Sequence, residues 1–176
     1  MTMPTLQEII DSAIEPALRL LPDKMSAPAS RDRLLVQLLA NGLQESRFKF
    51  RYQVVQGKPG LKGPARGYWQ FEKGTEKTRG GVTGVLLHSA TREPAQALCR
   101  ARGIPATAEA VWGAVENDDI LAAGFARLLL WTDPFPLPNL GESQAAWELY
   151  LRTWRPGQPH RHTWDGLYAQ ALDAVK

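Results

Sequence analysis

Apolar residues recur at helical spacing over most of the chain. Between residues 5 and 21 they fall at every third or fourth position, which predicts a helix that Pro16 kinks or divides. A second helix is predicted from Ser30, a residue type favoured at helix starts, to about Ser46. After Thr83 the same spacing predicts helices over 83–89, 93–102, 107–115, 118–131, 142–154 and 163–175, with Thr107, Asn117 and Thr163 near three of the starts.

The residues between Phe48 and Gly81 follow a different pattern. Glycine and proline are frequent there, and two short runs, Tyr52–Gln56 and Tyr68–Phe71, favour extended backbone. We therefore predict a loop-rich lobe with at most two or three short strands. The fold class that follows is mainly α, with a small loop-rich extended lobe set between helices.

Length and composition indicate one globular domain over residues 1–176. The hydrophobic fraction of 44% and the charged fraction of 22% are ordinary for a folded domain. The one cysteine, Cys99, has no partner for an intramolecular disulfide, and its apolar neighbours predict a buried thiol. The N-terminal stretch is acidic and interrupted by charges, so we expect no signal peptide, no membrane span and synthesis in a bacterial cytoplasm.

The net charge of +3 fits a nucleic acid, an anionic lipid or an anionic polymer such as the cell wall as partner. The nearest approach to a nucleic-acid-binding stripe is a C-terminal group with two tryptophans, and a solvated basic end explains it equally well. Nucleic acid is therefore not the favoured partner. This group consists of Arg152, Trp154, Arg155, His160, Arg161, His162 and Trp164.

A metal site is disfavoured because the two histidines of that C-terminal group, His160 and His162, lack a third ligand. His88 stands alone, and Cys99 is expected to be buried. No glycine-rich phosphate loop and no recognisable nucleophile–histidine motif is present. We expect neither a metal nor a cofactor, and the sequence leaves the oligomeric state open.

Glu45 stands at the end of an apolar helical stripe. At about 100° per residue it has nearly the same angle as Leu34 and Leu38, so the core-facing stripe ends in a carboxyl group. Gly42, one turn earlier, is expected to leave space above it. Partial burial and the negative end of the helix dipole favour the neutral acid, which suits protonation of a glycosidic oxygen. A solvated glutamate in a fraying last turn is the alternative, which periodicity alone favours.

The motifs around Glu45 resemble those of the lysozyme superfamily, chiefly goose-type lysozymes and soluble lytic transglycosylases. Glu45–Phe48 (Glu-Ser-Arg-Phe) is similar to the Glu-Ser-x-Phe end of the family's catalytic helix, and Gly67–Gln70 (Gly-Tyr-Trp-Gln) to its Gly-Leu-Met-Gln segment. Residues 117–129 and 147–157 resemble its later motifs less closely. The chain departs from the family in Tyr68 and Trp69 and in a basic insert, Lys58–Arg66.

The resemblance implies cleavage of bacterial peptidoglycan at the MurNAc–GlcNAc linkage. The expected absence of a signal peptide points to an enzyme of phage or prophage type. Such an enzyme acts on the wall after holin release or as a virion component. Glu45 would be the catalytic acid, and Gln70 would line the cleft near the acetamido sugar. The other implied substrate-binding residues are Ser46 and the aromatic residues Tyr68, Trp69 and Tyr150, with a core position as the alternative for Trp69.

A second carboxylate has no motif of its own. Glu72 is the nearest candidate, with Glu76 and Asp133 behind it. A lytic transglycosylase needs one catalytic carboxyl and most hydrolases need two, so the resemblance favours the lytic transglycosylase over the hydrolytic lysozyme. The alternative is a non-catalytic phage structural or wall-binding protein that retains a lysozyme-like fold. A filled groove, or Glu45 held in a salt bridge, would favour that alternative.

Overall fold

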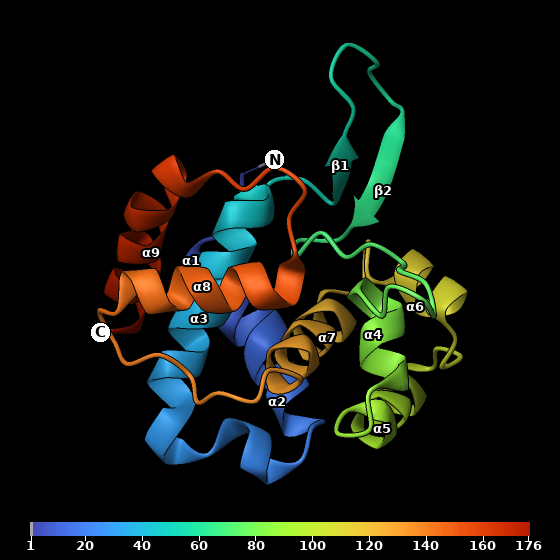
Figure 1. Ribbon diagram of the computed structural model, residues 1–176, viewed down its shortest axis with the longest axis horizontal. Coiled ribbons are helices and arrows are strands. Elements are labelled where there is room, and N and C mark those ends of the chain that lie inside the picture. The colour runs from blue at the N-terminus through green and yellow to red at the C-terminus, as the bar shows by residue number, and fades with distance from the viewer. Residues whose placement is uncertain (1) are drawn as a thin grey trace.

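Helices form most of the fold, shown in Figure 1 as a computed structural model that describes residues 2–176. The predicted mainly α class with a small extended lobe is confirmed. The helices are α1 (Leu6–Ile9), α2 (Glu15–Arg19), α3 (Arg31–Ser46), α4 (Gly81–Leu87), α5 (Arg92–Arg102), α6 (Ala108–Ala114), α7 (Asp119–Trp131), α8 (Ser143–Trp154) and α9 (Arg161–Val175). A π-helix (Ile10–Ile14) and two 3₁₀ turns (Asp23–Ser26 and Pro28–Ser30) complete the N-terminal part.

The N-terminal helix changes its hydrogen-bonding pattern before Pro16. The π-helix Ile10–Ile14 joins α1 to α2, and Pro16 is the second residue of α2. Proline has no N–H to donate, and a wider helical turn directly before it is one way for a helix to continue. The predicted division at Pro16 is therefore a change of helix type within one helical run.

Helix α3 is enclosed by the rest of the protein. Every residue from Leu34 to Gln44 is buried, and α9 packs along the same helix. The buried Gln37 Nε2 donates to Asn41 Oδ1 at 3.0 Å and to the carbonyl oxygen of Ala146, in α8, also at 3.0 Å. These contacts fix the axis of α3 and so fix the position of its last turn, which carries Glu45.

The chain reverses direction directly after α3. Arg47 and Phe48 both adopt the left-handed conformation, at φ 57° and 53°, which side chains other than glycine rarely adopt. The Phe48 ring then lies against Gly42, where an added Cβ would be 2.2 Å from the ring atom Cζ. The expectation that Gly42 leaves open space above Glu45 is therefore wrong, because the Phe48 ring fills that space.

The extended lobe is the hairpin β1 (Tyr52–Val54) and β2 (Lys62–Arg66), which stands away from the helices in Figure 1. Strand β2 comes from the basic insert, which the sequence did not mark as extended. The predicted strand at Tyr68–Phe71 is wrong, because Gly67–Gln70 is a turn with a 3.0 Å hydrogen bond from Gln70 N to Gly67 O. Left-handed φ angles at Gly67 and Gln70 prevent a strand there.

The helices after residue 80 match the predictions to within two residues at each end. Thr107 caps α6, as expected, by accepting a hydrogen bond from Ala110 N at 3.2 Å. Asp118 caps α7 in place of Asn117, and its carboxylate accepts from Leu121 N at 2.9 Å. None of the helices within residues 2–176 is long and apolar enough to cross a membrane.

The close packing of Phe48 on Gly42 gives a first prediction. Gly42→Ala should lower the free energy of unfolding by about 1–3 kcal/mol, because the buried Phe48 ring must shift to admit the new methyl group. Gly113→Ala in α6 is the matched control, since its new methyl group meets no atom within 4 Å. This control should be neutral or stabilising by up to about 1 kcal/mol. Denaturant melts that rank the two variants equally would contradict the packing argument.

Candidate active site

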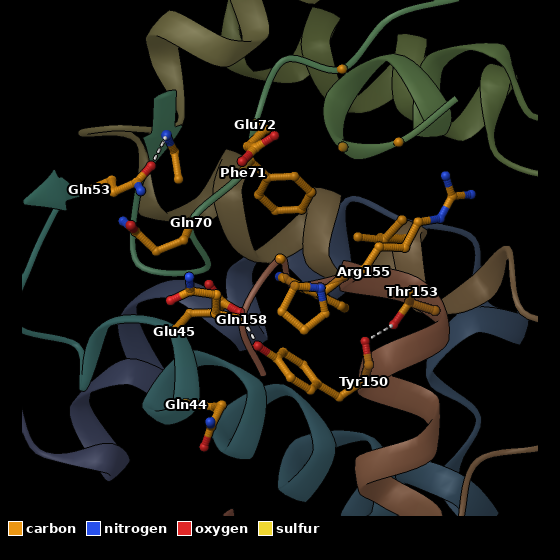
Figure 2. Close-up of a pocket in the computed structure, with 18 of the residues that line it drawn as sticks. Gln44, Glu45, Gln53, Gln70, Phe71, Glu72, Tyr150, Thr153, Arg155 and Gln158 are labelled. Atoms are coloured by element: carbon orange, nitrogen blue, oxygen red, sulfur yellow. Dashed lines mark hydrogen bonds between the residues drawn. The ribbon is translucent and has the colours of Figure 1, made fainter. Parts of the chain in front are cut away.

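A groove of about 650 Å³ opens beside the last turn of α3 (Figure 2). The end of α3, the segments 70–74 and 78–81, and the end of α8 with the loop that follows form most of it, and residues of the β1–β2 hairpin and Leu129 of α7 complete the lining. The structure brings together four of the residues singled out in the sequence, Glu45, Gln70, Glu72 and Tyr150, which all line this groove. It is therefore the place to test the chemistry expected of Glu45.

Glu45 is the last residue but one of α3, and its environment favours the neutral acid. Burial raises the pKa of its carboxyl from the ordinary 4.5 to about 7. The hydrogen bond from Tyr150 lowers the pKa, the negative charge of Glu72 raises it, and the positive charge of Arg47 lowers it. Desolvation is the dominant effect, so the Glu45 carboxyl exchanges a proton near neutral pH.

Tyr150 holds the Glu45 carboxyl in place. Its hydroxyl donates a hydrogen bond to Glu45 Oε1, and its ring stacks between Trp164 and Trp154, with centroids 5.5 and 6.3 Å away. Burial, and then the charge of Glu45, raise the pKa of the Tyr150 hydroxyl, which keeps its proton. Tyr150 is thus a fixed donor that orients one carboxyl oxygen and leaves the other oxygen for further contacts.

Ser46 has a structural role and is not available to a ligand. Its side chain is buried, and its hydroxyl donates to the carbonyl oxygen of Tyr68 at 2.6 Å while accepting from Phe48 N at 3.1 Å. These two bonds join the end of α3 to the turn that carries Gln70. The implied substrate contact of Ser46 is corrected accordingly, and its contribution to the groove is to fix two walls relative to each other.

The aromatic pair Tyr68 and Trp69 lies in the core and does not line the groove. Trp69 is fully buried, and its indole Nε1 donates to the carbonyl oxygen of Leu38 at 2.9 Å. Tyr68 is buried between the edge of the Phe48 ring and the guanidinium of Arg51, which lies 4.4 Å from the Tyr68 ring centre. The expectation that these two rings face a sugar is therefore wrong, since both side chains are buried and neither lines the groove.

Other side chains take that place in the groove. Trp154 and Phe71 line it, and the Trp154 Nε1 donates to the carbonyl oxygen of Trp69 at 2.9 Å. The amide side chains of Gln53 and Gln158 line it as well (Figure 2). The four-residue spacing of Tyr150 and Trp154 on one helix is a sequence signal that could have identified Trp154. Nothing in the sequence pattern marks the two glutamines.

Of the three candidate second carboxylates, only Glu72 lines the groove. It is an exposed residue and its charge acts on Glu45. Asp133 borders a neighbouring cavity, where its carboxylate binds the guanidinium of Arg152 through two hydrogen bonds of 2.8 and 3.1 Å. Glu76 is exposed and lines neither cavity. Neither Asp133 nor Glu76 is therefore placed to act together with Glu45.

The C-terminal basic group does not form one ligand-binding face. Trp164 is fully buried, and Arg161 forms an ion pair with Asp165 at 3.1 Å. The rings of His160 and His162 lie 5.8 Å apart. Within residues 2–176, no three or more histidines, cysteines or acidic residues gather in a way that could hold a metal ion. This part of the chain contributes to the groove only through a few residues, including His160.

The raised pKa of Glu45 predicts a pH-dependent stability. The unfolded chain releases this proton near pH 4.5 and the folded chain near pH 7, so wild type has the full contribution below pH 4.5 and loses it as the pH rises through 7. The loss corresponds to about 3 kcal/mol. Glu45→Gln does not titrate, so its stability relative to wild type should rise by about that amount between pH 4.5 and 8 in denaturant melts. The exposed Glu148→Gln should show no such trend.

Comparison with known proteins finds no family model, no curated protein and no solved structure that matches this chain.

Proposed function

We propose that this protein cleaves the glycan strands of bacterial peptidoglycan at the MurNAc–GlcNAc linkage, with Glu45 as the general acid. The observation that carries the proposal is a carboxyl group with a pKa of about 7 that lines an open groove at the end of a buried helix. Cleavage of a glycosidic bond requires such a protonated carboxyl near neutral pH. The resemblance of Glu45–Phe48 to the end of a lysozyme-superfamily catalytic helix points to the same chemistry.

In the first step, the Glu45 carboxyl donates its proton to the glycosidic oxygen. The bond between that oxygen and C1 of MurNAc breaks, GlcNAc leaves with a free 4-hydroxyl group, and positive charge develops at C1. Tyr150 continues to donate to Glu45 Oε1 and stabilises the carboxylate as it forms. The nearby carboxylates of Glu45 and Glu72 both favour the positive charge on the sugar.

In the second step, the Glu45 carboxylate accepts a proton from the C6 hydroxyl of the same MurNAc. The C6 oxygen closes on C1 and gives a 1,6-anhydro end, so the reaction consumes no water and restores the Glu45 acid. One carboxyl group carries both proton transfers. This lytic transglycosylase route is favoured over the hydrolytic lysozyme because Glu45 is the carboxyl group in the groove whose pKa is strongly raised, whereas Glu72 is exposed.

The lining of the groove suits a sugar polymer. The half-buried Trp154 offers aromatic surface, against which the apolar face of a sugar ring packs. The side-chain amides of Gln53, Gln70 and Gln158 supply donors and acceptors for hydroxyl and acetamido groups. The proposed partner is accordingly the glycan of the bacterial wall, reached after holin release or from a virion.

A non-catalytic wall-binding or structural protein is the alternative from another class. It would be favoured by a filled groove or by a Glu45 locked in an ion pair. The groove is open, with a volume of about 650 Å³, and within residues 2–176 Glu45 has no ion-pair partner. A carboxyl group with a pKa of about 7 that lines an open groove is suited to donating a proton to a ligand. These observations favour the enzyme.

The proposal predicts loss of activity when the transferable proton is removed. Glu45→Gln should fold normally and lower the rate of glycan cleavage by about 10²–10⁴-fold, measured by clearing of purified cell walls. Wild-type activity should fall about tenfold for each pH unit above about 7, because the Glu45 acid ionises there. The exposed Glu148→Gln should behave as wild type. Wall clearing by Glu45→Gln at the wild-type rate would exclude Glu45 as the acid.

The products distinguish the two routes. We expect 1,6-anhydro-MurNAc ends in the mass spectra of digested peptidoglycan, with no oxygen taken up from ¹⁸O-labelled water. Glu72→Gln should then lower the rate by less than Glu45→Gln does, since Glu72 transfers no proton in this route. Reducing MurNAc ends that contain ¹⁸O, together with an equal loss in both variants, would instead establish a hydrolase with Glu72 as its second carboxylate.

A further inference from the structure

A second cavity, of about 290 Å³, adjoins the groove. The two share Leu129, Thr153 and Arg155 in their walls, so a ligand in the groove lies next to this cavity. Figure 2 shows the Arg155 guanidinium directed away from Glu45, on the side of the groove where Thr153 lies. A group that branches from a polymer in the groove could therefore reach this cavity.

The lining of the second cavity is positively charged. It includes three arginines, Arg79, Arg152 and Arg155, and a single carboxylate, Asp133. Arg152 already holds both oxygens of Asp133, whose side chain is only 5% exposed, so these two charges cancel. Neither Arg79 nor Arg155 has a carboxylate within ion-pair distance in residues 2–176. Two guanidinium groups are thus left without a counter-charge.

The backbone of both arginines is fixed by its conformation and by contacts with neighbouring segments. Arg79 and Arg155 adopt the left-handed conformation, at φ 50° and 49°, which has a cost for a residue with a side chain. Arg155 Nη1 donates to the carbonyl oxygen of Thr78 at 2.8 Å and so joins the two segments. A Cβ added to Gly84 would lie 2.2 Å from the carbonyl oxygen of Arg79. Helix α4 therefore packs directly against the backbone of Arg79.

We propose that this cavity binds a carboxylate of the peptide that branches from the muramic acid of the substrate. This inference rests on the proposed function. Guanidinium groups bind carboxylates through paired hydrogen bonds, and the exposed Arg79 and Arg155, which no carboxylate of the described residues pairs, are free to bind one. The stem peptide is attached to the sugar on which cleavage occurs, and it carries free carboxylates. The protein therefore prefers peptide-bearing glycan over bare glycan.

The test compares two soluble glycan oligomers, one with stem peptides and one from which an amidase has removed them. Both are freed of wall phosphate polymers, so the peptide is the one anionic group that differs. Wild type should cleave the peptide-bearing oligomer with a KM about tenfold lower. Arg79→Gln should remove that preference by raising KM for this oligomer, with kcat unchanged. Arg79 is the residue to change because it does not line the catalytic groove.

Two further variants separate charge from folding. Arg79→Lys keeps the positive charge without the paired donors, so it should retain part of the preference, with a KM about threefold above wild type. Arg100→Gln, an exposed arginine of α5 outside both cavities, should keep the full preference. Equal cleavage of both oligomers by wild type, or an equal loss on both in Arg79→Gln, would overturn the peptide site alone. If wild type cleaves neither oligomer, the proposed function and this site are both overturned.

Discussion

The hydrogen bond from Tyr150 to Glu45 connects the core of the protein to its groove. Glu45 ends a helix that is buried along most of its length, and Tyr150 belongs to a stack of aromatic rings that also includes Trp164. Both partners are therefore held by packing that extends far beyond the site. Burial in this packed surrounding raises the pKa of the carboxyl to about 7, although the Tyr150 hydrogen bond acts in the opposite direction. Ionisation of Glu45 therefore lowers the free energy of unfolding, because the folded protein favours the neutral acid.

Periodicity predicted most of the fold because apolar residues recur at helical spacing along the helices. In α3, which is buried on all sides from Leu34 to Gln44, the positions of Leu34 and Leu38 gave the angle of Glu45 on the helix. The position of Glu45 at the end of this helix could thus be derived from residue spacing. Its groove partner Tyr150 was assigned through a motif, because two residues 105 positions apart share no local pattern.

The residues around the turn could not be predicted in the same way. A left-handed conformation at Gln70, a non-glycine residue, leaves no mark in a hydrophobicity pattern, yet it turns Gln70 toward the groove. Aromatic residues are equally ambiguous, because a core and a sugar-binding surface both use them. Trp69 lies in the core and Trp154 lines the groove, and the difference depends on tertiary contacts that the sequence pattern does not show. The space beside Gly42 was misjudged for the same reason, since Phe48 returns to fill it after the chain reverses.

The hairpin β1–β2 forms one wall of the groove through Gln53 and Ala65, but it has little core of its own. A two-stranded hairpin is at best marginally stable in water. Ion pairs join it to a distant part of the chain: Arg51, just before β1, to Asp119 at 2.6 Å, and Lys62 and Arg66 to Glu116 at 2.8 and 3.2 Å. The Trp112 indole also donates to the carbonyl oxygen of Pro64 at 2.8 Å. Salt weakens the ion pairs, so we expect high ionic strength to loosen the hairpin, and with it this wall of the groove, before the helices unfold.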